Sequence, residues 1–231
     1  MIQISNLTKK YGETAVFSNL NYTFENTCIY GLVGRNGAGK TTLLNILSNY
    51  DKNYTGVISI DGEKMNKVDY LDMPVAYAMD QPSFFNELTI YENLLLIASS
   101  RKIKKQEAFD KIERILDGLG LKKYENYSPL ELSKGTMQRL NNACAMIQEE
   151  KITIFDEPFS GLDPVQMKLL ENVMVEFHKK EKGIYIISSH DIECLQNVCD
   201  KCLLLHNGQI REINTEEVDR EKIAKILSEG E

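Results

Sequence analysis

The feature that most constrains this chain is a glycine-rich run that ends in a lysine and two threonines. The run reads Gly34-Arg35-Asn36-Gly37-Ala38-Gly39-Lys40-Thr41-Thr42 and matches the pattern G-x-x-x-x-G-K-[ST]. Residues 28–33 before it read as a short buried strand, and residues 42–47 after it read as a helix with one apolar side. Because this pattern holds phosphates when it joins a strand to a helix, we predict a site for a nucleoside triphosphate.

The residue types of the run suit a triphosphate and a metal ion. Glycines at 34, 37 and 39 permit left-handed backbone angles, so that successive N–H groups can converge on phosphate oxygens at a helix N-terminus. Lys40 adds a point charge for the terminal phosphates, and Thr41 offers a hydroxyl to Mg²⁺. A glycine-rich turn with an exposed lysine is the alternative interpretation, and the surrounding sequence favours the phosphate site.

Composition narrows the class of protein. The 231 residues carry a net charge of −7, and phosphate-backbone binding normally requires a basic face, so we expect no nucleic-acid partner. No apolar run approaches the roughly eighteen residues of a membrane span, and the N-terminus lacks a charged-then-apolar signal pattern. We therefore expect a protein of the cytosol or of the cytosolic face of a membrane.

The cysteines admit two interpretations. Cys194, Cys199 and Cys202 have the spacing of three ligands in one kind of iron–sulfur site. Residues 191–198 read as a helix and residues 201–205 as a strand, and positions five apart on a helix lie about 140° apart around its axis. Because these thiols do not readily converge, reduced and half-buried cysteines are the favoured interpretation.

Strand-like segments recur along the chain, and several are continuous apolar runs. They lie near residues 2–4, 15–24, 28–33, 56–60, 75–79, 152–155, 184–188 and 201–205. Continuous apolar strands are typical of a mainly parallel sheet with helices on both faces, so we predict an α/β core.

Helical periodicity replaces the strand signal between about residues 86 and 150. Phe109, Ile112, Leu116 and Leu119, for example, stand three and four residues apart. We predict a helical lobe inserted into the α/β core. The tail, residues 215–231, alternates charged and apolar residues as a peripheral helix would.

Two adjacent carboxylates follow the apolar strand 152–155. Because strands of open α/β sheets present ligand groups at their carboxyl ends, Asp156 and Glu157 should emerge beside the phosphate loop. Asp156 is then placed to hold Mg²⁺, directly or through water, opposite Thr41. Neighbouring side chains on a strand point in opposite directions, which leaves Glu157 to orient or deprotonate an attacking water.

Further motifs carry a resemblance to a known family. Gln81 follows the strand 75–79; Leu132-Ser133-Lys134-Gly135-Thr136 ends the helical segment; Ser160-Gly161-Leu162-Asp163 follows the acidic pair; and Ser188-Ser189-His190 ends the next strand. With these motifs, the chain resembles the nucleotide-binding subunit of an ATP-binding cassette (ABC) transporter over nearly its whole length.

The resemblance implies a fold and a division of the chain. We expect one nucleotide-binding domain, residues 1–231, with a P-loop NTPase core, a mainly parallel sheet, an antiparallel β subdomain and an inserted helical lobe. Residues 1–85 and 151–231 would form the ATP-binding core lobe, and residues 86–150 the helical lobe. ATP and Mg²⁺ are the implied cofactors.

The resemblance also implies residue roles. Tyr11 would stack on adenine, as aromatic rings do with nucleobases in general. Gln81 would contact the attacking water or the metal ion, and His190 would reach the terminal phosphate. Ser133, Lys134 and Gly135 would serve a second nucleotide-binding subunit, and Asp163 would lie at the contact between subunits. Asp163 before a proline also predicts a helix start by itself.

The signature departs from the family's commonest form, Leu-Ser-Gly-Gly-Gln, at two positions. Lys134 replaces the first glycine and Thr136 replaces the glutamine, while Ser133 and Gly135 are kept. A cation at 134 either assists anion binding or lies in solvent, and we favour solvent. The effect of both replacements on the hydrolysis rate stays open.

We therefore expect an ATPase subunit that dimerises on ATP and drives transmembrane permease subunits on separate chains. The chain would be cytoplasmic and peripheral on the inner face of the cell membrane, with a peptide or drug as the exported cargo. Phe84 and Phe85 are candidate permease contacts. A soluble ABC ATPase of macromolecular assembly is the alternative, which the acidic charge and the short length disfavour.

Overall fold

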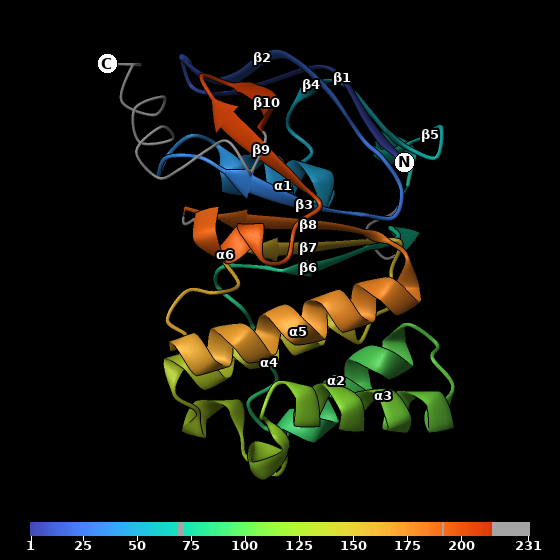
Figure 1. The fold of residues 1–231 in the computed structure, drawn as a ribbon. Coiled ribbons are helices and arrows are strands. Elements are labelled where there is room, and N and C mark those ends of the chain that lie inside the picture. The colour runs from blue at the N-terminus through green and yellow to red at the C-terminus, as the bar shows by residue number, and fades with distance from the viewer. Residues whose placement is uncertain (69–71, 191, 214–231) are drawn as a thin grey trace.

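The computed structural model describes residues 1–68, 72–190 and 192–213, and the predicted tail helix lies outside them. Two sheets and several helices are stacked in layers (Figure 1). A four-stranded antiparallel sheet covers one end, a six-stranded sheet lies across the middle, and a group of helices forms the other end.

The six-stranded sheet has the order β10-β9-β3-β8-β7-β6, and all of its pairs except β9 with β10 are parallel. Its strands are β3 (Cys28–Val33), β6 (Val75–Ala78), β7 (Ile152–Asp156), β8 (Ile184–Ser189), β9 (Lys201–His206) and β10 (Gln209–Ile213). Every residue of β3, β7 and β8 is buried, because layers of structure cover both faces of these strands. The predicted α/β core with a mainly parallel sheet is confirmed.

The antiparallel sheet has the order β2-β1-β4-β5 and packs over helix α1 (Lys40–Leu47). Its strands are β1 (Ile2–Tyr11), β2 (Thr14–Phe24), β4 (Thr55–Ile60) and β5 (Glu63–Lys64). The strand β1 runs seven residues further than the predicted 2–4. Polar residues and irregular register with β2 interrupt the apolar alternation there, so the sequence pattern does not show the extension.

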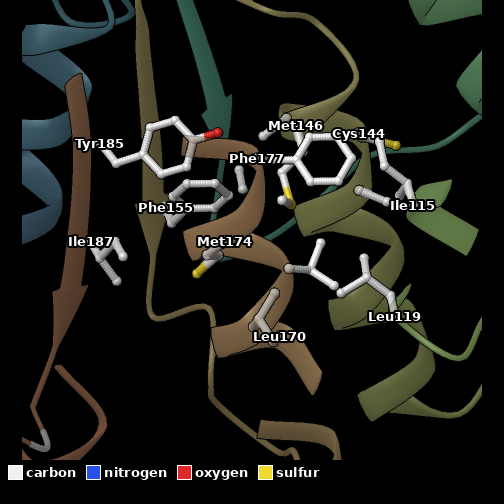
Figure 2. Close-up of a cluster of buried hydrophobic side chains, with 14 of the residues drawn as sticks. Ile115, Leu119, Cys144, Met146, Phe155, Leu170, Met174, Phe177, Tyr185 and Ile187 are labelled. Atoms are coloured by element: carbon white, nitrogen blue, oxygen red, sulfur yellow. The ribbon is translucent and has the colours of Figure 1, made fainter. Parts of the chain in front are cut away.

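Three helices connect β6 to β7 in the chain, within the segment of predicted helical periodicity. They are α2 (Ile90–Ser100), α3 (Lys105–Gly118) and α4 (Lys134–Met146), and α5 (Pro164–Glu181) and α6 (Ile192–Gln196) follow after β7 and β8. Figure 2 shows the core between sheet and helices, where Phe155 and Tyr185 of the sheet face Met174 and Phe177 of α5. This core fixes the helices beneath the sheet.

Two negative findings apply to the part of the chain that the structure describes. None of its helices combines the length and the apolar character that crossing a bilayer requires. Within the same residues, no group of three or more histidine, cysteine, aspartate or glutamate side chains is arranged to hold a metal ion. The cysteines are free, as expected, but Cys28, Cys144, Cys194 and Cys202 are buried and only Cys199 is half-buried.

Candidate nucleotide and hydrolysis site

The glycine-rich run forms the loop between β3 and α1. Gly37 and Gly39 have φ angles of 82° and 100°, in the left-handed region that favours glycine. Gly34 does not, so our expectation of a left-handed angle at that position is wrong. A glycine is needed at position 34 for a steric reason instead, because a Cβ there would lie 2.9 Å from the carbonyl oxygen of Leu205.

The helix α1 begins at a cavity of about 400 Å³. Gly39 is the N-cap of α1 and supplies no side-chain cap, so the N-terminal amides keep their capacity for an anion. Lys40 is buried, and its Nζ donates to the carbonyl oxygen of Gly34 at 2.8 Å. The cavity is lined by Tyr11, Val16, Arg35, Asn36, Gly37, Gly39, Lys40, Thr41, Thr42, Asp80, Asp156 and Glu157.

The carboxyl ends of β7 and β8 bring the acidic pair to the same edge of the sheet as the loop. Their parallel register places Asp156 opposite Ser188. Ser188 Oγ donates to Asp156 Oδ1 at 2.5 Å and accepts the N–H of Glu157 at 3.0 Å. Ser188 was not among the predicted site residues, although its place at a strand end, two residues before His190, pointed to this edge of the sheet.

Asp156 has one carboxylate oxygen ready for a ligand. The residue is buried, and among the described residues no donor hydrogen-bonds to its Oδ2. Burial and the charge of Asp156 raise the pKa of nearby Tyr77, whose hydroxyl donates to Asn45 Oδ1 at 3.0 Å instead. An unpaired buried carboxylate oxygen is costly, and carboxylate and hydroxyl oxygens are the donors that Mg²⁺ prefers. Asp156 and Thr41, which line one cavity, therefore fit that ion.

Glu157 lies between Lys40 and His190. Its Oε1 is 3.7 Å from Lys40 Nζ, and its Oε2 is 2.9 Å from Nδ1 of the exposed His190. The Glu157 backbone is left-handed, with φ of 50°, a conformation that costs a non-glycine residue roughly 1–3 kcal/mol. The carboxylate is thus directed at the cavity and held there from both sides.

Of the two residues predicted at the margin of the cavity, Tyr11 lines it and Gln81 does not. Tyr11 lines the cavity with 55% of its surface exposed. Gln81 is exposed and is not among the lining residues, whereas its neighbour Asp80 is. Asp80 was not among the predicted site residues, although an acidic residue at the end of an apolar strand could have indicated a place at the cavity. The loop residues Gly34 and Ala38 also lie outside the lining.

The signature residues do not join this cavity within one chain. Ser133 caps α4 by accepting the N–H of Thr136 at 3.2 Å, and Ser133 and Lys134 are exposed. The aliphatic stem of Lys134 passes Gly161, as a Cβ on that glycine would lie 3.8 Å from Lys134 Cδ. Asp163 is exposed and caps α5 through the N–H of Gln166 at 2.9 Å. Ser133, Lys134 and Asp163 are thus exposed to solvent, and none of them lines the cavity of its own chain.

The fold and these motifs define a P-loop ATPase of the cassette type, and comparisons with known proteins give its family. The family model described as ABC transporter matches residues 17–160. The chain therefore belongs to the ABC transporter family, and it is an ATP-binding and ATP-hydrolysing subunit of that family.

Curated relatives and solved structures agree with the assignment. The chain is similar to the bacitracin transport ATP-binding protein BcrA of Enterococcus faecalis, with 31% identity over 95% of this chain and 71% of the relative. It is 30% identical to the tungstate uptake ATP-binding protein TupC of Peptoclostridium acidaminophilum, over 91% of this chain and 97% of the relative. A solved ATP-binding subunit of an ABC transporter superimposes with a TM-score of 0.88, at 26% identity and over 99% of both chains.

Proposed function

We propose that this subunit binds ATP with Mg²⁺ in the cavity at α1 and hydrolyses it in a dimer that drives a separate permease. One observation carries the hydrolytic part: Lys40, Thr41, Asp156 and Glu157, which are far apart in sequence, line one cavity. Positive charge, metal ligands and a water-activating carboxylate are the parts that phosphoryl transfer from ATP requires.

These four residues and the N-terminus of α1 have chemical roles in this proposal. The N-terminal amides of α1 and Lys40 bind the β- and γ-phosphates. Thr41 and Asp156 would hold Mg²⁺, directly or through water, and the ion would supply neutralisation of the charge on those phosphates. Glu157 orients or deprotonates the attacking water, because its carboxylate faces the cavity and Ser188 fixes its backbone.

Two further residues lie next to Glu157 in the proposed mechanism. His190 holds Glu157 Oε2 through Nδ1 and is exposed, so its ring is accessible to the terminal phosphate. Gln81 would contact the attacking water or the metal ion; in this structure it is exposed and does not line the cavity.

We further propose that a second nucleotide-binding subunit, the same chain or a related one, completes the site. Ser133, Lys134 and Gly135 stand at or near the N-terminus of α4, and none of them lines the cavity of their own chain. An exposed helix N-terminus with a serine cap suits the γ-phosphate held by a partner. A solved dimeric ABC transporter cassette has the same fold as this chain, with a TM-score of 0.81 at 24% identity.

Residues 86–150 act as the helical lobe and transmit the work to the permease in this proposal. Phe84 packs against the core, whereas Phe85 is 59% exposed, so Phe85 is the better candidate contact. Asn93 of α2 holds the Phe85 backbone on both sides, at 3.0 Å to its N–H and 3.0 Å to its carbonyl oxygen. Two hydrogen bonds from Asn93 therefore hold Phe85, the candidate permease contact, against the helical lobe.

The cargo and the cellular location are proposals that go beyond the family assignment. We propose export of a peptide or drug, since one of the relatives above is named for bacitracin transport. The subunit would lie in the cytoplasm, on the inner face of the cell membrane, beside its permease. Co-expression with the neighbouring gene products tests this part: the subunit should fractionate with membranes, and a subunit that stays alone in the soluble fraction contradicts it.

Replacement of Glu157 by glutamine tests the hydrolytic role. The substitution keeps the shape of the side chain and removes the base, so turnover should fall by about 10²–10⁴. ATP binding should persist, and the ATP-bound dimer should accumulate. Lys40→Ala is the matched comparison, because it should weaken ATP binding itself. Turnover equal to that of the parent in Glu157→Gln would refute the role of Glu157.

A further inference from the structure

A buried lysine outside the hydrolytic machinery lies beside the cavity. Lys9 of β1 is only 2% exposed, and its Nζ is 2.6 Å from Asp51 Oδ2 and 2.8 Å from the carbonyl oxygen of Asn53. Burial opposes ionisation of Asp51, but hydrogen bonds from Lys9 and from the N–H of Asn53 keep its pKa below the usual range. Lys9 is therefore firmly held by its carboxylate partner, without which a lysine is almost never fully buried.

This lysine lies against the ring of Tyr11. Residues two apart on a strand share a face, and Lys9 Nζ lies 4.7 Å from the centroid of the Tyr11 ring. The Tyr11 hydroxyl also donates to Asp51 Oδ2 at 3.4 Å. Because Lys9 is buried while Tyr11 is 55% exposed, the lysine covers the ring face turned to the protein. The exposed part of Tyr11 borders the cavity that Lys40 and Thr41 also line.

The same ion pair ties the ring to the phosphate-binding helix. Asp51 follows the end of α1, and its N–H donates to the carbonyl oxygen of Asn45 within that helix at 3.0 Å. The helix begins at Lys40, in the phosphate loop. A chain of contacts therefore runs from the Tyr11 ring through Lys9 and Asp51 to the element that would hold the phosphates. These contacts together hold the Tyr11 ring at a set distance from the phosphate loop.

We propose that Lys9, held by Asp51, positions Tyr11 as the platform for the nucleobase of bound ATP. The ammonium ion fixes one face of the ring by a cation–π contact, and the base stacks on the other. This inference rests on the proposed nucleotide site and assigns Lys9 a positioning role, since no atom of Lys9 would touch the nucleotide. It concerns base recognition and leaves the cleavage step to Glu157.

Binding measurements on the full chain test the proposal, with ATP and inorganic tripolyphosphate as the two probes. Lys9→Met keeps the aliphatic stem and removes the charge, so the Kd for ATP should rise between about threefold and thirtyfold. The Kd for tripolyphosphate, which has no base, should stay unchanged, and so should kcat at saturating ATP. Lys10→Met, on the exposed neighbouring position of β1, should change neither affinity.

A double substitution distinguishes positioning from a general structural effect. In a Tyr11→Leu background, Lys9→Met should have no further effect on ATP affinity, because the platform is already gone. Parent-like ATP affinity of Lys9→Met, equal losses for ATP and tripolyphosphate, or an undiminished loss in the Tyr11→Leu background would each overturn the proposal. If Lys9→Met fails to fold, Asp51→Asn releases the lysine and is held to the same outcomes.

The failure of this inference is separable from the failure of the proposed function. Loss of tripolyphosphate binding in Lys40→Ala and loss of turnover in Glu157→Gln do not involve Lys9. The hydrolytic site therefore stands if only the Lys9 results are negative, and it falls if those two variants behave as the parent does.

Discussion

Replacement of Thr136 by valine tests how the signature serine is held. Thr136 is 3% exposed and receives a hydrogen bond from Arg139 Nη2 at 3.2 Å, and a guanidinium group can only donate. The buried Thr136 hydroxyl therefore needs an acceptor for its own proton. Within the part of the chain described, the acceptor that it reaches is Ser133 Oγ, at 2.9 Å. Ser133 Oγ also accepts the N–H of Thr136, so its own proton is directed outward as a donor.

The magnitude follows from the hydrogen bonds involved. A hydrogen bond from Ser133 to a charged phosphate contributes about 1.5–3 kcal/mol, so Ser133→Ala should lower the rate of hydrolysis by roughly tenfold to hundredfold. Loss of the neutral bond that orients it costs about 0.5–1.5 kcal/mol, so Thr136→Val should lower the rate by roughly twofold to tenfold. Thr136→Ser keeps the hydroxyl and should retain the parent rate.

The assay is the steady-state ATPase rate of the parent, both single variants and the double variant. If Thr136 acts through Ser133, Thr136→Val should have no effect in the Ser133→Ala background. Thermal unfolding is measured in parallel, because the valine also leaves Arg139 Nη2 without this acceptor. Additive rate losses, or a rate loss in Thr136→Val that Thr136→Ser shares, would refute the reasoning. No effect of Ser133→Ala would refute the in-trans site itself.

Two further predictions concern the loop and the ion pair beside it. Gly39→Ala should weaken ATP binding and lower the melting temperature, because φ at Gly39 is 100° and the new Cβ would lie 2.6 Å from a methyl group of Val16. Gly62→Ala is the control for backbone strain alone, because φ at Gly62 is 86° and no atom would lie within 4 Å of the new Cβ. The pKa of Asp51 is lowered in the folded protein, so the carboxylate stabilises the fold at pH values above its unfolded pKa of about 3.9. This stabilisation is lost as the pH falls through the lower pKa of the folded protein. Denaturation of Asp51→Asn should show a deficit against the parent at pH 7 that shrinks below about pH 4, and a deficit independent of pH would contradict the assignment.

Short-range patterns were enough to predict the sheet and the phosphate loop. The apolar strand 28–33, the glycines and Lys40 are contiguous, and the geometry of a parallel sheet then places the Asp156 end of β7 beside them. The local helix start at Asp163 followed from its own side chain in the same way.

Contacts between distant residues could not be read from the sequence. Lys9 reads as one more lysine on a polar strand, and its burial depends on a carboxylate 42 positions away at Asp51. Asp80 and Gln81 are adjacent, and the direction of the backbone decides which of them faces the cavity. The bridge from Ser188 to Asp156 depends on strand register, which the sequence fixes only to within a residue or two.

The backbone at Glu157 connects these observations to catalysis. A glycine would adopt φ of 50° with little strain, yet it would have no carboxylate to place between Lys40 and His190. The chain keeps a strained residue at the point where the strand ends, and Ser188 holds both it and Asp156. Strain that surrounding hydrogen bonds maintain at a cavity wall is typical of functional sites. We therefore propose that this local geometry is kept for the carboxylate of Glu157, and the replacement of Glu157 by the isosteric amide is the sharpest test of the mechanism.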